Sequence, residues 1–311
     1  MSCNLCGQRD AVFFRVYSGE KLCKNCFILS IEKKVRKTIS KYDMFKLDDR
    51  IAVAVSGGKD SLALLQILYK IEKKFPKANI FAVTVDEGIE GYRDEAVENA
   101  KEICEKLSVE HVVVSFKELY GITVDEIAQK TRDRKGDLTP CSYCGALRRK
   151  ALNMIARKHG ATKIATAHTL DDEVQTILLN FIHGDVFRAS RVEPKLGGEN
   201  GKFVQRVKPF CEIPQDEVAL YAYFKNIRFQ SKDCPYAELA LRSEIREFLN
   251  KLEANHPGTK FVIYRSFEKV RPLLKPALKP EIKECQICGE PTGKTICEPC
   301  SLLKKIIKLE E

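Results

Sequence analysis

The stretch Ile51-Ala52-Val53-Ala54-Val55-Ser56-Gly57-Gly58-Lys59-Asp60-Ser61-Leu62 joins an apolar run to a segment with helical periodicity. The run Ile51–Val55 predicts a buried strand, and the leucines from Leu62 onward recur at the spacing of one helix face. Two glycines between them let the backbone approach an anion, which the N–H groups at the helix N-terminus then hold. Lys59 adds a positive charge, and the hydroxyls of Ser56 and Ser61 add donors. The stretch therefore predicts a phosphate-binding loop.

Strands and helices alternate on both sides of this loop. Further strand-like runs cover Ile80–Val85, Val109–Val114 and Lys163–Ala167. Helical patterns cover 28–45, Ser61–Phe75, Arg93–Leu107, Ala146–His159 and Leu170–Ile182. This alternation predicts an α/β fold, in which helices cover both faces of a parallel sheet and ligands bind at the carboxyl ends of the strands.

The chain has 13 cysteines, and ten of them form five Cys-x-x-Cys pairs. It shows no leader for export, so we expect a cytoplasmic location, where thiols stay reduced and bind metal rather than form disulfides. Two pairs at each end supply the four thiolates of a structural zinc site. The eight predicted zinc ligands are Cys3, Cys6, Cys23, Cys26, Cys285, Cys288, Cys297 and Cys300.

The fifth pair, Cys141 and Cys144, has no second pair to complete a zinc site. Cys234 is the plausible third partner, whereas Cys104 and Cys211 are predicted to be buried fillers. Three thiolates could hold a [4Fe–4S] cluster with one iron open to an exogenous ligand. Alternatively, the cysteines could carry a persulfide and resolve it as a disulfide, or bind a third zinc.

The formal charge of +10 is concentrated at the two ends. Residues 1–50 hold 11 Lys and Arg against 6 Asp and Glu, and residues 260–311 hold 11 against 7. A polyanion such as nucleic acid would bind mainly to these ends. The alternative is the solvated, ion-rich surface of a heat-adapted protein. No apolar run reaches the length that crosses a bilayer, so no membrane association is expected.

Four domains are predicted from these patterns. They are an N-terminal four-cysteine zinc module (1–27), a catalytic domain (28–208), a helical extension and linker with Cys234 (209–280) and a C-terminal four-cysteine zinc module (281–311). Residues 191–202 are predicted to form a loop, residues 209–275 to be mostly helical, and residues 276–280 to be the linker.

The phosphate loop resembles the S-G-G-x-D-S loop of the PP-loop ATP pyrophosphatases. That resemblance implies ATP, whose pyrophosphate the loop holds while a substrate oxygen attacks the α-phosphate. Asp60 would then help to place Mg²⁺. Adenine and ribose would find backbone partners at the strand ends, with Ala54, Val83–Val85 and Thr166–His168 as candidates, among them Val83, Ala167 and His168.

More of the chain resembles one branch of that superfamily, the tRNA uridine 2-sulfurtransferases of archaea and the eukaryotic cytoplasm with their T-loop-modifying relatives. The shared features are the motifs around Cys141, His168 and Cys234 together with the terminal cysteine modules. The resemblance implies that Cys141, Cys144 and Cys234 bind a [4Fe–4S] cluster and that Arg148 lies near ATP. It also implies tRNA as substrate, a ubiquitin-like carrier protein or free sulfide as sulfur donor, and a possible homodimer.

The resulting hypothesis is a two-step tRNA thiolation, with adenylation of a uridine O2 followed by attack of sulfur on C2. Lys59 would stabilise the leaving pyrophosphate, and Asp171 with Asp172 would bind Mg²⁺, assist proton transfer or cap their helix. The rivals are another PP-loop enzyme, forming lysidine or 2-thiocytidine, and a non-catalytic RNA-binding zinc protein. No residue distinguishes a wobble from a T-loop uridine, and the role of His168 stays open.

Overall fold

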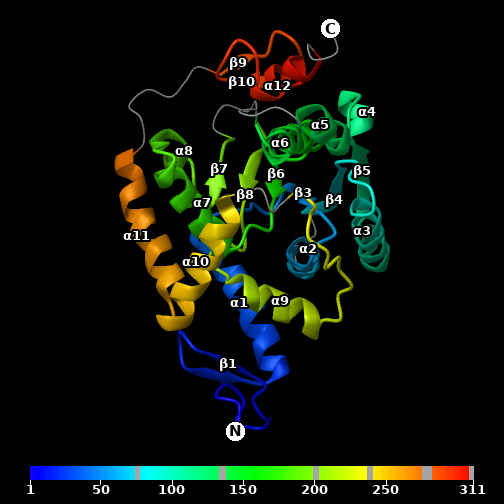
Figure 1. Cartoon of the computed structure of the whole chain (residues 1–311). Coiled ribbons are helices and arrows are strands. Elements are labelled where there is room, and N and C mark those ends of the chain that lie inside the picture. The colour runs from blue at the N-terminus through cyan, green and yellow to red at the C-terminus, as the bar shows by residue number, and fades with distance from the viewer. Residues whose placement is uncertain (74–77, 133–137, 199–202, 237–240, 275–281, 308–311) are drawn as a thin grey trace.

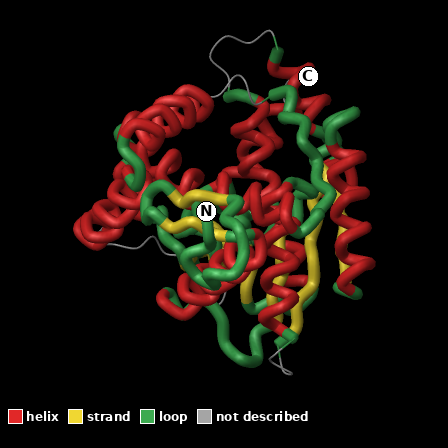
Figure 2. Tube along the Cα trace, turned by 90° about the horizontal axis from the view of Figure 1, so that it is seen from below, coloured by secondary structure: helices red, strands yellow, loops and turns green. Residues whose placement is uncertain are grey.

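The computed structural model describes residues 1–311 apart from 74–77, 133–137, 199–202, 237–240, 275–281 and 308–311. A six-stranded sheet with strand order β5-β4-β3-β6-β8-β7 lies between helices (Figure 1; Figure 2). The four-cysteine modules lie at opposite ends of the molecule in Figure 1. The predicted α/β class is therefore confirmed.

The sheet is parallel except at one edge. Its strands are β3 (Arg50–Ala54), β4 (Asn79–Asp86), β5 (Glu110–Ser115), β6 (Lys163–Ala165), β7 (Lys195–Leu196) and β8 (Gln205–Val207). Only β7 pairs antiparallel with its neighbour. The four predicted strands are confirmed as β3 to β6. The other two were not predicted, because Lys195–Leu196 and Gln205–Val207 are short and contain polar residues instead of an apolar run, and β7 falls within the predicted loop 191–202.

Both faces of the sheet are buried, as a parallel sheet requires. In β3, Ile51 and Val53 pack in one core with helices α2 (Lys59–Glu72), α3 (Arg93–Leu107) and α7 (Leu170–Ile182). Ala52 faces the other side, in a second core with Ile155 of α6 (Pro140–Lys158). Alternate residues of one strand therefore hold helices on opposite faces.

Three helices have bounds that differ from the predictions. Helices α3 and α7 have the predicted bounds, and α2 begins at Lys59 instead of Ser61. Helix α6 begins at Pro140, well before the predicted Ala146, because proline suits the first helical position. Helix α1 (Lys24–Lys41) replaces the predicted 28–45 and ends before Asp43, whose φ of 46° is not helical.

The N-terminal module is joined to the core by a buried ion pair. Its hairpin of β1 (Phe13–Arg15) and β2 (Glu20–Leu22) was predicted. Arg15 is 2% exposed, and its Nη2 lies 2.7 Å from Oε2 of Glu217 in α9 (Gln215–Phe224). The predicted domain boundary after residue 27 falls inside α1, so this module and the next domain share a helix.

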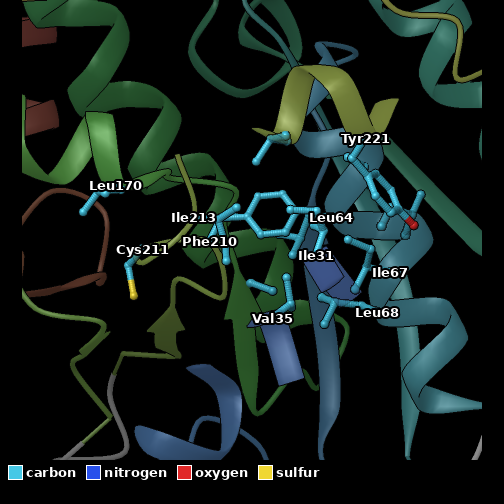
Figure 3. Packing of buried hydrophobic residues seen from close by; sticks show 14 of the residues in the cluster. Ile31, Val35, Leu64, Ile67, Leu68, Leu170, Phe210, Cys211, Ile213 and Tyr221 are labelled. Carbon is cyan, nitrogen blue, oxygen red and sulfur yellow. The ribbon is translucent and has the colours of Figure 1, made fainter. Parts of the chain in front are cut away.

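The largest cluster of buried apolar residues that the structure describes is assembled from distant segments (Figure 3). Ile31 and Val35 of α1, Leu64 of α2 and Phe210 belong to this cluster, and Tyr221 of α9 packs there too. Cys104 and Cys211 are 1% and 0% exposed, as predicted for buried fillers.

The region 209–275 is mostly helical, as predicted. It contains α9, α10 (Leu241–Asn255) and α11 (Thr259–Leu274), whereas residues 225–236 between them form neither helix nor strand. The predicted linker 276–280 lies outside the described residues. Three short helices complete the central domain, namely α4 (Phe116–Tyr120), α5 (Val124–Thr131) and α8 (Val186–Ser190).

The C-terminal module packs on α6. It consists of β9 (Lys283–Glu284), β10 (Pro291–Thr292) and α12 (Glu298–Ile307). Leu302 and Ile306 of α12 share a buried cluster with Tyr143 and Leu147 of α6. In the described part of the chain, no helix is long and apolar enough to cross a membrane.

Candidate functional site

The phosphate loop lies between β3 and α2, as predicted. Gly57 has a φ of 82°, and a Cβ built on it would lie 2.1 Å from the carbonyl oxygen of Ala96. Only glycine fits there. The Ser56 N–H donates to Ser61 Oγ at 3.0 Å, and that hydroxyl donates to Gly58 O at 3.0 Å. These hydrogen bonds therefore fix the conformation of the loop at the N-terminus of α2.

Lys59 and Asp60 form an ion pair at the start of α2, with Nζ and Oδ2 2.8 Å apart. Burial raises the pKa of Asp60, although the Lys59 charge opposes the rise. Asp60 Oδ1 is buried without a hydrogen-bond partner. A buried carboxylate oxygen without a partner, next to a phosphate-binding loop, suits a hard cation such as Mg²⁺.

A buried carboxylate that was not predicted, Glu87, joins the loop to Arg148. It follows β4 directly, is 4% exposed and lies 2.7 Å from Arg93 Nε through its Oε2. Arg93 in turn donates to the carbonyls of Ser56 at 3.0 Å and Val85 at 2.8 Å. Glu87 Oε1 accepts from Arg148 Nη1 at 3.3 Å. The sequence signal for this group is an acid at the carboxyl end of a strand, in Asp86-Glu87-Gly88.

Cys141, Cys144 and Cys234 gather beside Arg148. Cys141 and Cys144 lie in the first turns of α6, and Cys234 lies in the segment 225–236. Cys141 Sγ donates to Tyr236 O at 3.1 Å, and Cys144 and Cys234 border the same apolar cluster. Burial raises the pKa of Cys144 to about 12, and the Arg148 charge opposes the rise. Helix α6 thus presents two thiols and one guanidinium to the segment with the third thiol.

This cysteine-bearing segment also touches the phosphate loop. The backbone N–H of Gln230 donates to Gly57 O at 3.2 Å, and its side-chain amide donates to Tyr92 O. Tyr236 fixes the other end of the segment by donating to Asp125 Oδ1 at 2.6 Å. The segment that carries Cys234 is therefore attached to the loop at Gly57 and held beside it through Tyr92 and Asp125.

The terminal cysteine quartets have the geometry of zinc sites. In each, all four sulfur atoms lie within 4.8 Å of one another. The Cys6–Cys23 and Cys288–Cys297 sulfur pairs are 3.9 and 3.7 Å apart. A tetrahedral site with Zn–S bonds of about 2.3 Å has sulfur–sulfur edges of about 3.8 Å. The donor set and its spacing therefore fit zinc in both modules.

Cys141, Cys144 and Cys234 have a wider spacing. Their sulfur atoms are not among the groups whose members all lie within 4.8 Å, a search that covered the described residues. A four-iron cluster is larger than a single ion, so its thiolates stand farther apart than those of a zinc site. The three cysteines therefore suit a [4Fe–4S] cluster better than a third zinc.

The remaining predicted ATP contacts lie at the sheet edge. Ala54 and Val83 are opposite each other in β3 and β4, and Val83 is 1% exposed with its carbonyl already accepting the Val55 N–H at 2.9 Å. Ala167 and His168 follow β6. Desolvation lowers the pKa of His168 to about 3, and its Nδ1 lies 2.9 Å from Thr166 Oγ1.

Asp171 and Asp172 both have partners within the protein. Asp172 forms the capping box of α7 with Thr169, the alternative considered for it from the sequence. Asp171 Oδ1 lies 2.5 Å from Lys260 Nζ, and its Oδ2 accepts the Gln215 N–H at 2.7 Å. Catalysis by Asp171 stays a prediction, and in this arrangement its carboxylate ties α7 to α9 and α11.

Comparison with known proteins adds independent findings. Residues 28–253 match the family model described as a PP-loop domain. The chain is 37% identical to the tRNA 2-thiolation protein NcsA of Haloferax volcanii, over 98% of this chain and 99% of the relative. It is also 37% identical to the tRNA-5-methyluridine(54) 2-sulfurtransferase of Pyrococcus horikoshii, over 100% of this chain and 96% of the relative.

A solved structure is similar over nearly the whole chain. It is the U34-tRNA thiolase NcsA from Methanococcus maripaludis with its [4Fe-4S] cluster, which superposes with a TM-score of 0.85 at 36% identity. The match covers 98% of this chain and 96% of that one. The similarity therefore includes both terminal modules as well as the central domain.

Proposed function

Because the chain belongs to the PP-loop family and, within it, to the tRNA 2-thiolation proteins, we propose that it replaces the C2 oxygen of a tRNA uridine with sulfur at the expense of ATP. The observation that carries this proposal is the contact between the phosphate loop and the cysteine-bearing segment, where Gln230 N–H donates to Gly57 O at 3.2 Å. A nucleotide-activating loop and a sulfur-handling cysteine group therefore border one site.

In the activation step, the uridine O2 attacks the α-phosphate of ATP and pyrophosphate leaves. The N–H groups and hydroxyls of residues 56–61 hold the phosphates, and Lys59 stabilises the charge on the pyrophosphate. Asp60 holds Mg²⁺, for which its unpartnered Oδ1 is suited. Arg148, half exposed and fixed by Glu87, contacts ATP from α6. Ala54, Ala167 and His168 supply the surface for adenine and ribose.

In the transfer step, sulfur attacks C2 of the activated uridine, the C2–O bond breaks, and AMP leaves with the former carbonyl oxygen. Cys141, Cys144 and Cys234 hold a [4Fe–4S] cluster, which supplies an iron without a protein ligand where sulfide can bind. Persulfide chemistry at the same cysteines is the alternative. The two zinc sites stabilise terminal modules that are too small to form hydrophobic cores of their own.

Several finer points stay predictions. The similar proteins modify two different uridines, 34 and 54, at nearly equal identity to this chain, so identity alone does not select one. A ubiquitin-like carrier protein or free sulfide is the proposed sulfur donor. We also propose a cytoplasmic location, where thiols stay reduced, and, from the resemblance alone, a homodimer.

The test is an anaerobic assay with cluster-loaded protein, unmodified tRNA, ATP and sulfide, followed by mass spectrometry of the nucleosides. We expect the wild-type protein to form 2-thiouridine. The Cys234→Ser variant should lose both this activity and the visible absorbance of the iron–sulfur cluster. Cys104→Ala removes a buried thiol elsewhere and should retain activity. Full activity of Cys234→Ser would contradict the cluster role, and tRNA binding by the wild type without thiolation would favour the non-catalytic alternative.

A further inference from the structure

Two arginines without carboxylate partners face each other beside the proposed site. Asn153 Oδ1 on α6 accepts the N–H of Val204, which precedes β8, at 3.2 Å. Arg149 lies one helical turn before Asn153, and Arg206 lies two strand residues after Val204. Arg149 is thus displaced by about 6 Å from Asn153 along the helix, and Arg206 by about 7 Å from Val204 along the strand.

The displacement from Asn153 to Arg149 and the displacement from Val204 to Arg206 point in the same direction. Helix α6 connects two parallel strands, so it runs antiparallel to them. The N-terminal end of α6 and the C-terminal end of β8 therefore both lie toward the carboxyl edge of the sheet. Arg206 is opposite Ile164 of β6, whose side chain packs against Ile155 of α6. Arg206 therefore points to the face that α6 covers, toward Arg149.

The charges in this region are mostly of one sign. In the described part of the chain, neither Arg149 nor Arg206 is in an ion pair. Burial, followed by the charges of Arg149 and Arg191, lowers the pKa of Arg206 to about 10. Two acids border this region. Asp185 Oδ2 lies 3.3 Å from Arg188 Nε, and Glu298 of α12 lies 3.8 Å from Arg188 Nη2, with a charge that also reaches Arg149. Clustered guanidinium groups with so little compensation suit phosphate.

Helix α8 extends this basic surface with one exposed aromatic ring. Phe187 is 46% exposed, and the guanidinium of Arg191 lies 5.7 Å from its ring centroid. Val186, its neighbour on α8, is 49% exposed, as is Phe181 near the end of α7. An exposed aromatic ring next to cations is the arrangement that binds single-stranded RNA, because bases stack on the ring while arginines hold the backbone.

We propose that Arg149 and Arg206, with Arg191 and Phe187 beside them, form an RNA-binding surface that holds the backbone and one unstacked base of the tRNA next to the uridine being modified. This proposal rests on the proposed function for the identity of the RNA. Arg149 follows Arg148 on α6, and Arg206 precedes Val207, whose carbonyl accepts the N–H of Thr166 at 2.9 Å near His168. The surface thus adjoins both halves of the site.

The test measures binding of fluorescent, unmodified tRNA to the metal-loaded full chain at several salt concentrations without ATP. Arg149→Gln and Arg206→Gln should each weaken binding by about tenfold and lower the slope of log Kd against log salt by about one. Phe187→Ala should weaken binding at least about fivefold with the slope unchanged. Arg206→Lys should keep the slope. Lys106→Gln, at an exposed position on α3, controls for net charge.

Affinity for ATP, measured in parallel, separates two sources of phosphate. We expect all the variants to bind ATP as the wild type does. Loss of ATP affinity with unchanged tRNA binding would mean that the arginines serve the nucleotide and would overturn the proposal, as would unchanged affinity and salt slope for tRNA. A wild-type chain that neither binds nor thiolates tRNA would instead refute the proposed function.

Discussion

Arg93 Nη1 donates a hydrogen bond to the carbonyl oxygen of Ser56 at 3.0 Å, so the first residue of the phosphate loop is fixed from α3. The same guanidinium is paired with Glu87, which also holds Arg148. One buried carboxylate therefore sets the position of the loop and of the arginine beside the cysteines.

Glu87→Gln should impair both folding and activity. Loss of the Glu87 carboxylate leaves the Arg93 guanidinium, which is 6% exposed, without a countercharge. This should lower the free energy of unfolding by about 3–5 kcal/mol. Among molecules that still fold, the KM for ATP should rise because Ser56 and Arg148 lose their support. Urea unfolding and ATP kinetics measure the two effects. Glu90→Gln, an exposed neighbour, should change stability by less than about 0.5 kcal/mol; equal effects of both variants would refute the role of Glu87.

Gly57→Ala should abolish productive binding of ATP. The added methyl would meet the Ala96 carbonyl at 2.1 Å, so the loop would have to move. Gly91→Ala is the matched control, because Gly91 also has a positive φ of 66° but has nothing within 4 Å of the added carbon. The control should lose only about 1–2 kcal/mol of stability. Calorimetric titration with ATP compares them, and normal ATP affinity in Gly57→Ala would contradict the loop's role.

Glu72→Gln should make the protein more stable at alkaline pH. Burial and the Asp49 charge raise the pKa of Glu72 to about 7, from 4.5. Between pH 4.5 and about 7, Glu72 is therefore protonated in the folded chain but ionised in the unfolded chain. The contribution of this group to the free energy of unfolding is full below pH 4.5 and is lost as the pH rises through about 7. Removing the charge should add about 1–2 kcal/mol at pH 8 and little at pH 4.5. Urea unfolding at both values tests this, with Glu105→Gln as an exposed control; a gain independent of pH would exclude the mechanism.

Metal content should separate the three cysteine groups. We expect two zinc ions and about four irons per anaerobically prepared chain. Cys285→Ser should lose one zinc and keep its iron, whereas Cys144→Ser should lose iron and keep both zinc ions. Elemental analysis by mass spectrometry provides the counts. Loss of zinc in Cys144→Ser would instead indicate a third zinc site.

The sequence was sufficient for the parts of the fold with long apolar periods. The strand Ile51–Val55, the loop after it and the helix Leu170–Ile182 were predicted because each is a continuous local pattern. Strands β7 and β8 are short and partly polar, so they show no such pattern, and they exist because pairing extends the sheet. The start of α6 was missed because the helical pattern was predicted only from Ala146, whereas the helix begins at Pro140.

For the candidate site, local motifs identified the residues, but only the fold showed their partners. The spacing of the terminal cysteines predicted two quartets, which the structure brings together. Glu87 was not predicted, because its importance depends on Arg93 and Arg148, which reach it from separate helices. Asp171 was predicted as catalytic from its place after a strand, whereas its ion pair with Lys260 of α11 could not be foreseen from local sequence.

The most direct measurement is the ratio of AMP formed to sulfur incorporated in a single anaerobic turnover with excess cluster-loaded protein, ATP, sulfide and unmodified tRNA. If the phosphate loop and the three cysteines form one thiolation site, AMP and 2-thiouridine should appear together in a ratio of about one, and both should require tRNA. Formation of AMP without thiouridine, or of thiouridine without ATP, would contradict a shared site.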